Sequence, residues 1–293
     1  MKISEILNRN TPTLSFEVFP PKTYIAIADV KNTTEEIAAL RPDFMSVTFG
    51  AGGTTGDYTL YISENIQNKF GVPSLAHLTC VCSTAEMIKE RLDSFKAAGI
   101  ENIMALRGDI PKDVTLPREE WAYSHADELI RAIRKYGDFC IGGACYPEIH
   151  PESKSRREDI AHLKDKVEAG CDFLTTQMFF DNNILFNFLY HLREAEVKVP
   201  VIAGIMPVTN AVQIRRILQI SGTQLPQRFK AILDKFGENP AAMMQAGIAY
   251  ATDQIIDLYA NGINHVHVYT MNKPAVARKI SENLTDIIGR KAL

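Results

Sequence analysis

The chain has 293 residues, of which 46% are hydrophobic and 23% are charged, the proportions of an ordinary soluble globular protein. Its net charge of -3 and its scattered basic residues argue against a nucleic-acid partner, which would need a basic stripe along the phosphates. No segment approaches the roughly 20 apolar residues that span a bilayer, and the N-terminal residues lack the pattern of a secretory signal. We therefore expect a cytoplasmic protein with no membrane and no nucleic-acid partner.

Short apolar segments alternate with amphipathic ones along the whole chain. The predicted strands are 14–18, 44–48, 74–79, 102–106, 139–144, 172–177, 200–205 and 265–269. The predicted helices between them are 31–40, 57–69, 84–98, 121–135, 154–169, 183–195, 210–220 and 274–288. Repeated alternation of strand and helix predicts an α/β fold, a (β/α)8 TIM barrel whose parallel strands close on themselves.

Three further helices are predicted beyond the eight repeats. A short one at 2–9 should close the bottom of the barrel, and the stretch 224–261 should hold two more, at 225–236 and 239–260. Glycines 99, 170 and 262 follow predicted helices and mark their ends. No linker rich in Pro, Gly or Ser interrupts the chain, so we expect one domain over residues 1–293.

The five cysteines form an odd count and lie in or beside apolar segments. This pattern argues against disulfides and for a reducing compartment. Cys80 and Cys82 have only C-x-C spacing, which lacks the second pair of a zinc site. We expect mostly buried, inert thiols.

Polar residues end or follow nearly every predicted strand, where a hydrophobic core would not favour them. In a TIM barrel these carboxyl ends of the strands form one rim, which carries the active site. The residues that should meet there are Glu17, Thr48, His77, Asp109, Tyr146, His150, Gln177 and Tyr269. Such a rim is typical of an enzyme.

Glu17 lies within the otherwise apolar strand S-F-E-V-F-P-P. Burial disfavours an ionised carboxylate, so its pKa should rise and make it a candidate proton donor near neutral pH. A structural acid hydrogen-bonded across the barrel is an equally good interpretation of this residue alone.

The loop 107–120 is long, and loops of this length are usually functional or disordered. A tight turn at Gly108 would direct Arg107 and Asp109 to the rim, although a surface ion pair would also explain them. The glycines in 50–53 would let the backbone approach a ligand closely. They form no Walker or dinucleotide-binding pattern.

Other rim residues limit the chemistry. Residues 146–152 hold a tyrosine, a histidine and two glutamates, but prolines prevent a helical metal motif, so we predict no metal site. The amide of Gln177 suits the edge of a pterin or flavin ring, and Tyr269 offers stacking area, although either could simply fill the barrel. No serine lies in a nucleophile elbow, which argues against acyl transfer. No lysine lies clearly at the end of a strand, which argues against aldolase chemistry through a Schiff base. A planar, aromatic, partly anionic ligand fits this rim.

Eight segments in order resemble the methylenetetrahydrofolate reductase family. They are SFEVFPPK, VTFGAGG, HLTC, ALRGDIP, YPEIHPES, TTQMFFD, GIMPV and VYTMNK, which together involve every predicted strand. The resemblance implies a barrel that binds FAD and is reduced by NADH or NADPH. It would then reduce 5,10-methylenetetrahydrofolate to 5-methyltetrahydrofolate at the same flavin face, with the flavin carrying the hydride.

The resemblance also implies roles for individual residues. Glu17 would be the general acid that protonates the folate, and Asp109 would lower the flavin potential and stabilise a cationic iminium. The implied cofactor contacts are Thr48, His77, Arg107, Asp109, Tyr123, His125, Ala144, Tyr146, His150, Asp159 and Lys166, with Tyr123 and His125 competing for one place near the adenine. The implied substrate contacts are Glu17, Gln177, Gln213 and Tyr269.

The chain departs from the family pattern at two positions. Ile217 stands where a phenylalanine can sandwich the nicotinamide or folate tail, and Asp165 stands where some members have an arginine. The resemblance predicts a homo-oligomer, and some relatives work with an additional electron-transfer subunit. No regulatory domain that senses S-adenosylmethionine is expected, because the chain ends soon after the barrel.

Two other functions fit the same rim. A pterin-binding methyltransferase barrel would use similar acids and amides without a flavin. A non-catalytic barrel subunit would bind folate or a partner and carry out no reaction.

Overall fold

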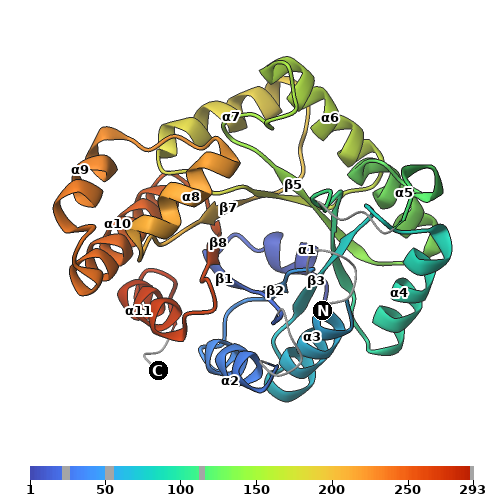
Figure 1. Ribbon diagram of the computed structural model, residues 1–293, viewed down its shortest axis with the longest axis horizontal. Helices are drawn as coiled ribbons and strands as arrows, with labels where there is room; N and C mark the ends of the chain where they lie inside the picture. The colour runs from blue at the N-terminus through green and yellow to red at the C-terminus, as the bar shows by residue number, and fades with distance from the viewer. Residues whose placement is uncertain (22–26, 50–55, 112–115, 291–293) are drawn as a thin grey trace.

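The computed structural model describes residues 1–21, 27–49, 56–111 and 116–290. Eight parallel strands pair in chain order and close into a barrel, because β1 also pairs with β8 (Figure 1). The strands are β1 Thr13–Val18, β2 Met45–Val47, β3 Ser74–Thr79, β4 Asn102–Leu106, β5 Cys140–Cys145, β6 Phe173–Thr176, β7 Val201–Ile205 and β8 His265–Tyr269. The predicted TIM barrel is confirmed, with β2 and β6 shorter than predicted.

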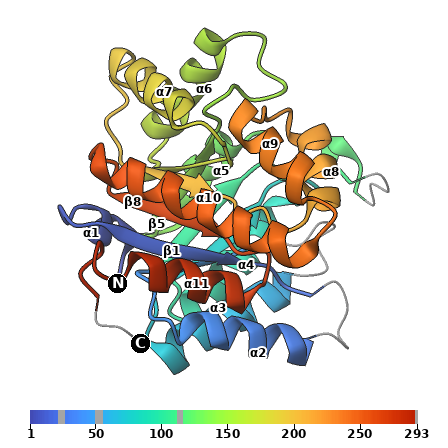
Figure 2. The same cartoon turned by 90° about the vertical axis from the view of Figure 1, so that its left-hand side faces the viewer.

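Helices surround the barrel, and α1 lies across one of its ends (Figures 1 and 2). The outer helices are α2 Ile27–Ala38, α3 Gly56–Phe70, α4 Ala85–Ala97, α5 Ala126–Tyr136, α6 Arg156–Glu168, α7 Asn182–Glu194, α8 Ala211–Ser221 and α11 Pro274–Leu284. The additional ones are α1 Ile3–Leu7, α9 Gln227–Phe236 and α10 Pro240–Ala260. Within the described ranges, no helix is both long and apolar enough to cross a membrane.

The helix predicted at 121–135 begins later than expected, at Ala126. A short 3-10 turn, Arg118–Glu120, comes first, and His125 is the extended N-cap of α5. The Glu128 carboxylate accepts hydrogen bonds from the backbone N–H groups of Ser124 and His125. This capping interaction fixes the start of the helix, and apolar periodicity does not reveal it.

The cysteines follow the prediction. Cys80, Cys140, Cys145 and Cys171 are buried, Cys82 is half-buried, and none of these thiols forms a disulfide. Burial raises the pKa of the Cys80 thiol to about 12. Thiolates, the reactive form of cysteine, are therefore disfavoured in the barrel wall.

Helix α1 closes the bottom of the barrel. Ile3 and Leu7 pack with Phe44, Phe173 and other side chains at the amino-terminal ends of the strands. The backbone N–H of Ile3 donates to the Asn102 side chain at 2.8 Å, which fixes the helix on the barrel. The predicted plug is confirmed, and it buries an apolar layer beneath the polar residues higher in the barrel.

We predict that Ile3→Ala lowers the free energy of unfolding by about 2–5 kcal/mol, because Ile3 is fully buried and its loss leaves a cavity under the barrel. Chemical denaturation of the purified protein measures the change. Glu5→Ala is the control, since Glu5 lies on the exposed face of the same helix. Equal small effects of the two substitutions would show that the plug does not stabilise the fold.

Candidate active site

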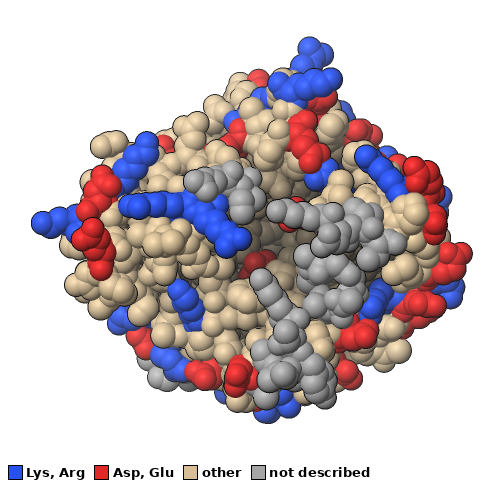
Figure 3. Space-filling view, viewed as in Figure 1, with Lys and Arg blue, Asp and Glu red and all other residues tan. Residues whose placement is uncertain are grey.

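A cavity of about 780 Å³ opens at the carboxyl ends of the strands. Figure 3 views this end of the barrel and shows a central hollow with acidic atoms at its bottom. The predicted residues that line the cavity are Thr48, His77, Arg107, Asp109, His125, Ala144, Tyr146, His150, Asp159, Lys166 and Gln177. The structure thus brings together side chains from β3 and β5, from the segments that follow β2, β4, β5 and β6, from the start of α5 and from α6.

Glu17 lies directly beside this cavity. Its carboxyl Oε2 is 3.9 Å from Nε2 of His77, which lines the cavity, and its side chain is 20% exposed. Burial raises the pKa of Glu17 to about 8, while the Ser46 hydroxyl beside it acts in the opposite direction. Glu17 is therefore mostly protonated at pH 7, as a general acid must be.

His77 does not hold Glu17 in its ionised form. Burial lowers the pKa of His77 to about 4, so the ring is neutral at pH 7. Its Nε2 is buried and has no hydrogen-bond partner among the described residues. The ring therefore offers a free nitrogen to a ligand in the cavity.

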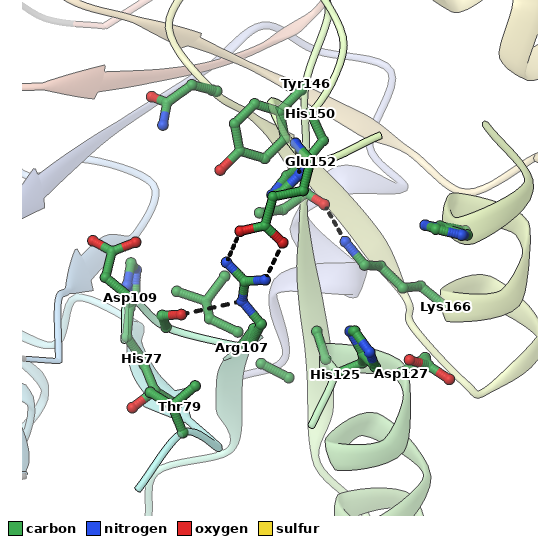
Figure 4. A pocket seen from close by; sticks show the side chains of 18 of the residues that line it. His77, Thr79, Arg107, Asp109, His125, Asp127, Tyr146, His150, Glu152 and Lys166 are labelled. Carbon is green, nitrogen blue, oxygen red and sulfur yellow. Dashed lines mark hydrogen bonds and ion pairs between the residues drawn. The ribbon is translucent and has the colours of Figure 1, made fainter. Parts of the chain in front are cut away.

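Arg107 forms an ion pair that the sequence did not indicate. Its guanidinium donates two parallel hydrogen bonds to the Glu152 carboxylate, across the cavity mouth (Figure 4). This contact raises the pKa of Arg107 and lowers the pKa of Glu152. The expected alternative, a surface ion pair between Arg107 and Asp109, is not the one observed.

Asp109 is held at the cavity by the turn before it. Gly108 has φ +87°, and a Cβ there would lie 2.9 Å from Thr79 and Val81, so only glycine fits this turn. Asp109 is exposed and lies on the side of the cavity where His77 is drawn (Figure 4). The turn predicted at residues 107–109 is thus present, and it directs both Arg107 and Asp109 to the cavity.

The opposite side of the cavity carries Lys166 on α6. Its ammonium group donates to the Ala144 carbonyl at 2.9 Å, and burial lowers its pKa (Figure 4). Asp159, two turns before Lys166 along α6, accepts from Ser153 through Oδ1, while its buried Oδ2 has no partner among the described residues. This end offers a half-buried amino group and a free carboxylate oxygen to a ligand.

Tyr146, His150 and Gln177 form the wall between the two ends. The rings of Tyr146 and His150 meet edge to face, with centroids 4.6 Å apart. The Gln177 side-chain oxygen accepts from the Met178 N–H at 2.9 Å, and burial is the main reason that the pKa of Tyr146 is raised. The wall combines aromatic area with an amide.

The remaining predicted substrate residues, Tyr269 and Gln213, are not among the residues that line the cavity. The Tyr269 hydroxyl donates to the Thr176 carbonyl, one residue before Gln177, and Gly204 leaves room for this contact. A Cβ on Gly204 would lie 2.5 Å from the Tyr269 hydroxyl. Gln213 is half-buried in the first turn of α8, where its backbone N–H is capped by Asn210.

Tyr123 lies elsewhere in the molecule. It lines a second cavity, of about 550 Å³, between α4 and α5, whereas His125 borders the main cavity. Residues 121–125 are not helical and precede the start of α5. Of the two competing positions, the structure brings only His125 to the cavity.

The turn after β8 clamps the end of β1. The Asn272 side-chain amide accepts from the Phe19 N–H at 3.0 Å and donates to the Phe19 carbonyl at 2.8 Å. The Thr270 hydroxyl donates to the Glu17 carbonyl at 2.7 Å. Asn272 adopts a left-handed backbone with φ 51°, which non-glycine residues rarely do. This turn fixes the backbone that carries Glu17.

The loop glycines 50–53 lie outside the described residues. Among the residues that are described, no group of three or more His, Cys, Asp or Glu side chains is arranged to hold a metal ion. Ile217 is half-buried in the apolar cluster around α8 and α9, and Asp165 lines the cavity next to Lys166.

The chain matches a protein-family model over nearly its whole length. This model, for methylenetetrahydrofolate reductase, matches residues 2–285. The chain belongs to this family. The cavity described above is therefore a cavity of a methylenetetrahydrofolate reductase family member.

Individual relatives agree with this assignment. The chain is 35% identical to "Methylenetetrahydrofolate reductase (NADH) 1" of Arabidopsis thaliana over 97% of its length, and it spans about half, 50%, of that relative. It is 31% identical to "5,10-methylenetetrahydrofolate reductase" of Escherichia coli (strain K12), over 92% of this chain and 90% of the relative.

The chain shares its fold with a solved structure. It is an uncharacterised Clostridium thermocellum protein that binds two copies of 5-methyl-5,6,7,8-tetrahydrofolic acid. The TM-score is 0.67 over 98% of both chains, at 16% sequence identity. At that identity the likeness supports the fold alone.

We predict that Glu17→Gln stabilises the protein at alkaline pH. The folded-state pKa of Glu17 is raised from 4.5 to about 8, so folding carries no cost from this group below about pH 4.5 and a growing cost up to about pH 8. At pH 8 the variant should gain about 3–5 kcal/mol in unfolding free energy, and near pH 4 the gain should vanish.

Denaturant unfolding at several pH values measures this difference. Glu36→Gln is the control, because Glu36 is an exposed carboxylate on α2. A gain that is independent of pH would show that Glu17 is not destabilised by its own ionisation.

Proposed function

We propose that the chain reduces 5,10-methylenetetrahydrofolate to 5-methyltetrahydrofolate, with electrons from NADH or NADPH that pass through FAD in two successive half-reactions. Membership of the reductase family supports this proposal. The observation that carries it is the position of the Glu17 carboxyl, 3.9 Å from His77 at the edge of a polar cavity, where burial raises its pKa to about 8. The NADH-named plant relatives favour NADH as the donor.

The cavity residues fit a flavin dinucleotide. A volume of about 780 Å³ lies within the range of small-molecule and cofactor sites. Arg107 and the half-buried Lys166 would hold the diphosphate, and the unpaired Asp159 Oδ2 would accept from a ribose hydroxyl. The unpaired Nε2 of His77 would bond the ring system, with Thr48 and Asp109 beside it. When bound, FAD supplies the hydride transfer.

The residues around Glu17 suit a folate substrate. A protonated carboxyl donates its proton to one of the two nitrogens that hold the methylene bridge, which opens the bridge to an iminium that accepts hydride. The Asp109 carboxylate would stabilise this positive charge. The amide of Gln177 has the donor and acceptor that the pterin edge requires. Gln213 and Tyr269 lie on neighbouring segments and would complete the substrate side.

The purified protein should be yellow, and its flavin absorbance should bleach on anaerobic addition of NADH or NADPH and return on addition of methylenetetrahydrofolate. A colourless protein that takes up no FAD would contradict the proposal and favour a pterin-binding methyltransferase.

We predict that Glu17→Gln keeps flavin reduction by the nicotinamide within about threefold of the native rate but lowers the folate half-reaction by about a hundredfold or more, because only the second step needs the acid. Stopped-flow spectroscopy of each half-reaction measures this. In the native protein the folate step should slow as pH rises through about 8, where Glu17 loses its proton. Survival of both half-reactions in the variant would remove Glu17 from the role of acid.

We also predict that Asp109→Asn raises the flavin reduction potential, because a nearby carboxylate opposes the build-up of negative charge on reduced flavin. An anaerobic redox titration measures the potential. Asp127→Asn is the control, since Asp127 lies on a different side of the same cavity (Figure 4) and pairs with Arg131. An unchanged or lower potential in Asp109→Asn would contradict this role.

A further inference from the structure

Anionic ligands have few cations to bind in the main cavity. Of the described residues that line it, only Arg107 and Lys166 carry a Lys or Arg side chain, and each already has a partner within the protein. Carboxylates outnumber these cations in the same lining, namely Asp109, Asp127, Glu152, Asp159 and Asp165. The binding of a phosphate therefore depends on how readily the two cations leave the partners that they have.

Arg107 is the more fully occupied of the two cations. A guanidinium has two edges that present a pair of N–H donors side by side. One edge is filled by Glu152, because Nη1 donates to Oε2 and Nη2 donates to Oε1, the second at 2.8 Å (Figure 4). On the other edge, the Nε–H donates to the Gly108 carbonyl at 3.3 Å. Neither edge is left free for a phosphate to accept two hydrogen bonds.

The Glu152 side chain can leave Arg107 without moving the cavity wall. It is 62% exposed, so a released carboxylate returns to solvent. The backbone is held separately, because the Glu152 N–H donates to Nδ1 of His150 at 3.1 Å and the Ser153 N–H donates to the His150 carbonyl at 2.9 Å. Rotation of the Glu152 side chain therefore frees the guanidinium while His150 keeps its place.

We propose that Glu152 is an internal competitor for the anionic cofactor, whose diphosphate replaces the Glu152 carboxylate on the same edge of the Arg107 guanidinium. The exchange substitutes one pair of charge-assisted hydrogen bonds for another and transfers no proton and no electron. Part of the binding free energy of the ligand is used to open the ion pair, which lowers the apparent affinity. That the ligand is FAD rests on the proposed function, whereas the competition for Arg107 does not.

Glu152→Gln should raise the affinity of the purified, flavin-free chain for FAD by about twofold to fivefold, the range that the strength of a partly exposed ion pair allows. The amide keeps the shape of the side chain but loses the charge that holds Arg107. Quenching of flavin fluorescence during titration measures the dissociation constant. A weaker affinity would show that Glu152 positions Arg107 for the ligand, and it would overturn the proposal.

Asp127→Asn is the matched control. Asp127 also lines the main cavity and is also paired, with Nη1 of Arg131 at 2.6 Å. Arg131 lines the second cavity and not this one, so the substitution removes a carboxylate from the lining without freeing a cation in it. The affinity for FAD should stay close to the native value. Equal gains in Asp127→Asn and Glu152→Gln would contradict the competition.

A double-mutant cycle separates competition from simple charge repulsion. Arg107→Gln should weaken FAD binding, because it removes the guanidinium for which both anions compete. In that background Glu152→Gln should give no further gain, since no guanidinium is left to release. A gain of the same size in both backgrounds would show that Glu152 only repels the ligand, and it would overturn the proposal.

The ionisation of Glu152 reports the exchange directly. The hydrogen bond from Arg107 is the largest cause that lowers the pKa of Glu152, and His150 and His125 are the other cationic or titratable groups that act in this direction. Saturation with ligand should raise this pKa, because the guanidinium leaves and an anion takes its place. Carboxyl ¹³C NMR, with Glu152→Gln used to assign the signal, measures it. An unchanged pKa on saturation would contradict the exchange.

ADP as a second ligand distinguishes this inference from the proposed function, because it carries a diphosphate but no flavin. Glu152→Gln should raise the affinity for ADP, measured by titration calorimetry, by the same factor as for FAD. If ADP behaves in this way but FAD is not bound or not reduced, the proposed function is contradicted and the competition stands. If FAD is bound and reduced normally while Glu152→Gln changes neither affinity, the competition alone is contradicted.

Discussion

The arrangement of the candidate site depends on one carboxyl group, that of Glu17, whose ionisation is disfavoured inside the barrel. Glu17 stands on a strand whose other inward residues are buried, and burial raises its pKa to about 8. The histidine beside it is also neutral, because burial lowers the pKa of His77 to about 4. A protonated histidine would form a salt bridge and hold the acid ionised. Glu17 therefore keeps its proton because no cation lies next to its carboxyl group.

The cationic groups of the cavity are kept apart from this acid. Arg107 is paired with Glu152, and Lys166 bonds a carbonyl on the far side of the cavity. A cation next to Glu17 would stabilise the carboxylate and lower its pKa. The cavity therefore has a buried carboxyl group at one side and its cationic side chains at the other.

The barrel supports this arrangement in layers. An apolar layer closed by α1 lies at the bottom, the polar layer of Ser15, Ser46 and His267 lies above it, and Glu17 lies at the top. The stability that a buried carboxyl removes must come from the apolar core below and around it. The strained turn at Asn272, which clamps Phe19, is tolerated for the same reason.

The sequence by itself determined the barrel, the rim and the acid. Repeated alternation of apolar strands with amphipathic helices predicts the parallel barrel that the structure has, and Glu17 is evident because a carboxylate interrupts an apolar strand. Only the tertiary structure decided the partner of Arg107, the exclusion of Tyr123 from the cavity and the hydrogen bonds of His267 with Ser15 and Ser46. A strand pattern shows which side chains point inward. It does not show the register between β8, β1 and β2, nor where a side-chain cap starts a helix, because both are set by contacts between residues far apart in the sequence.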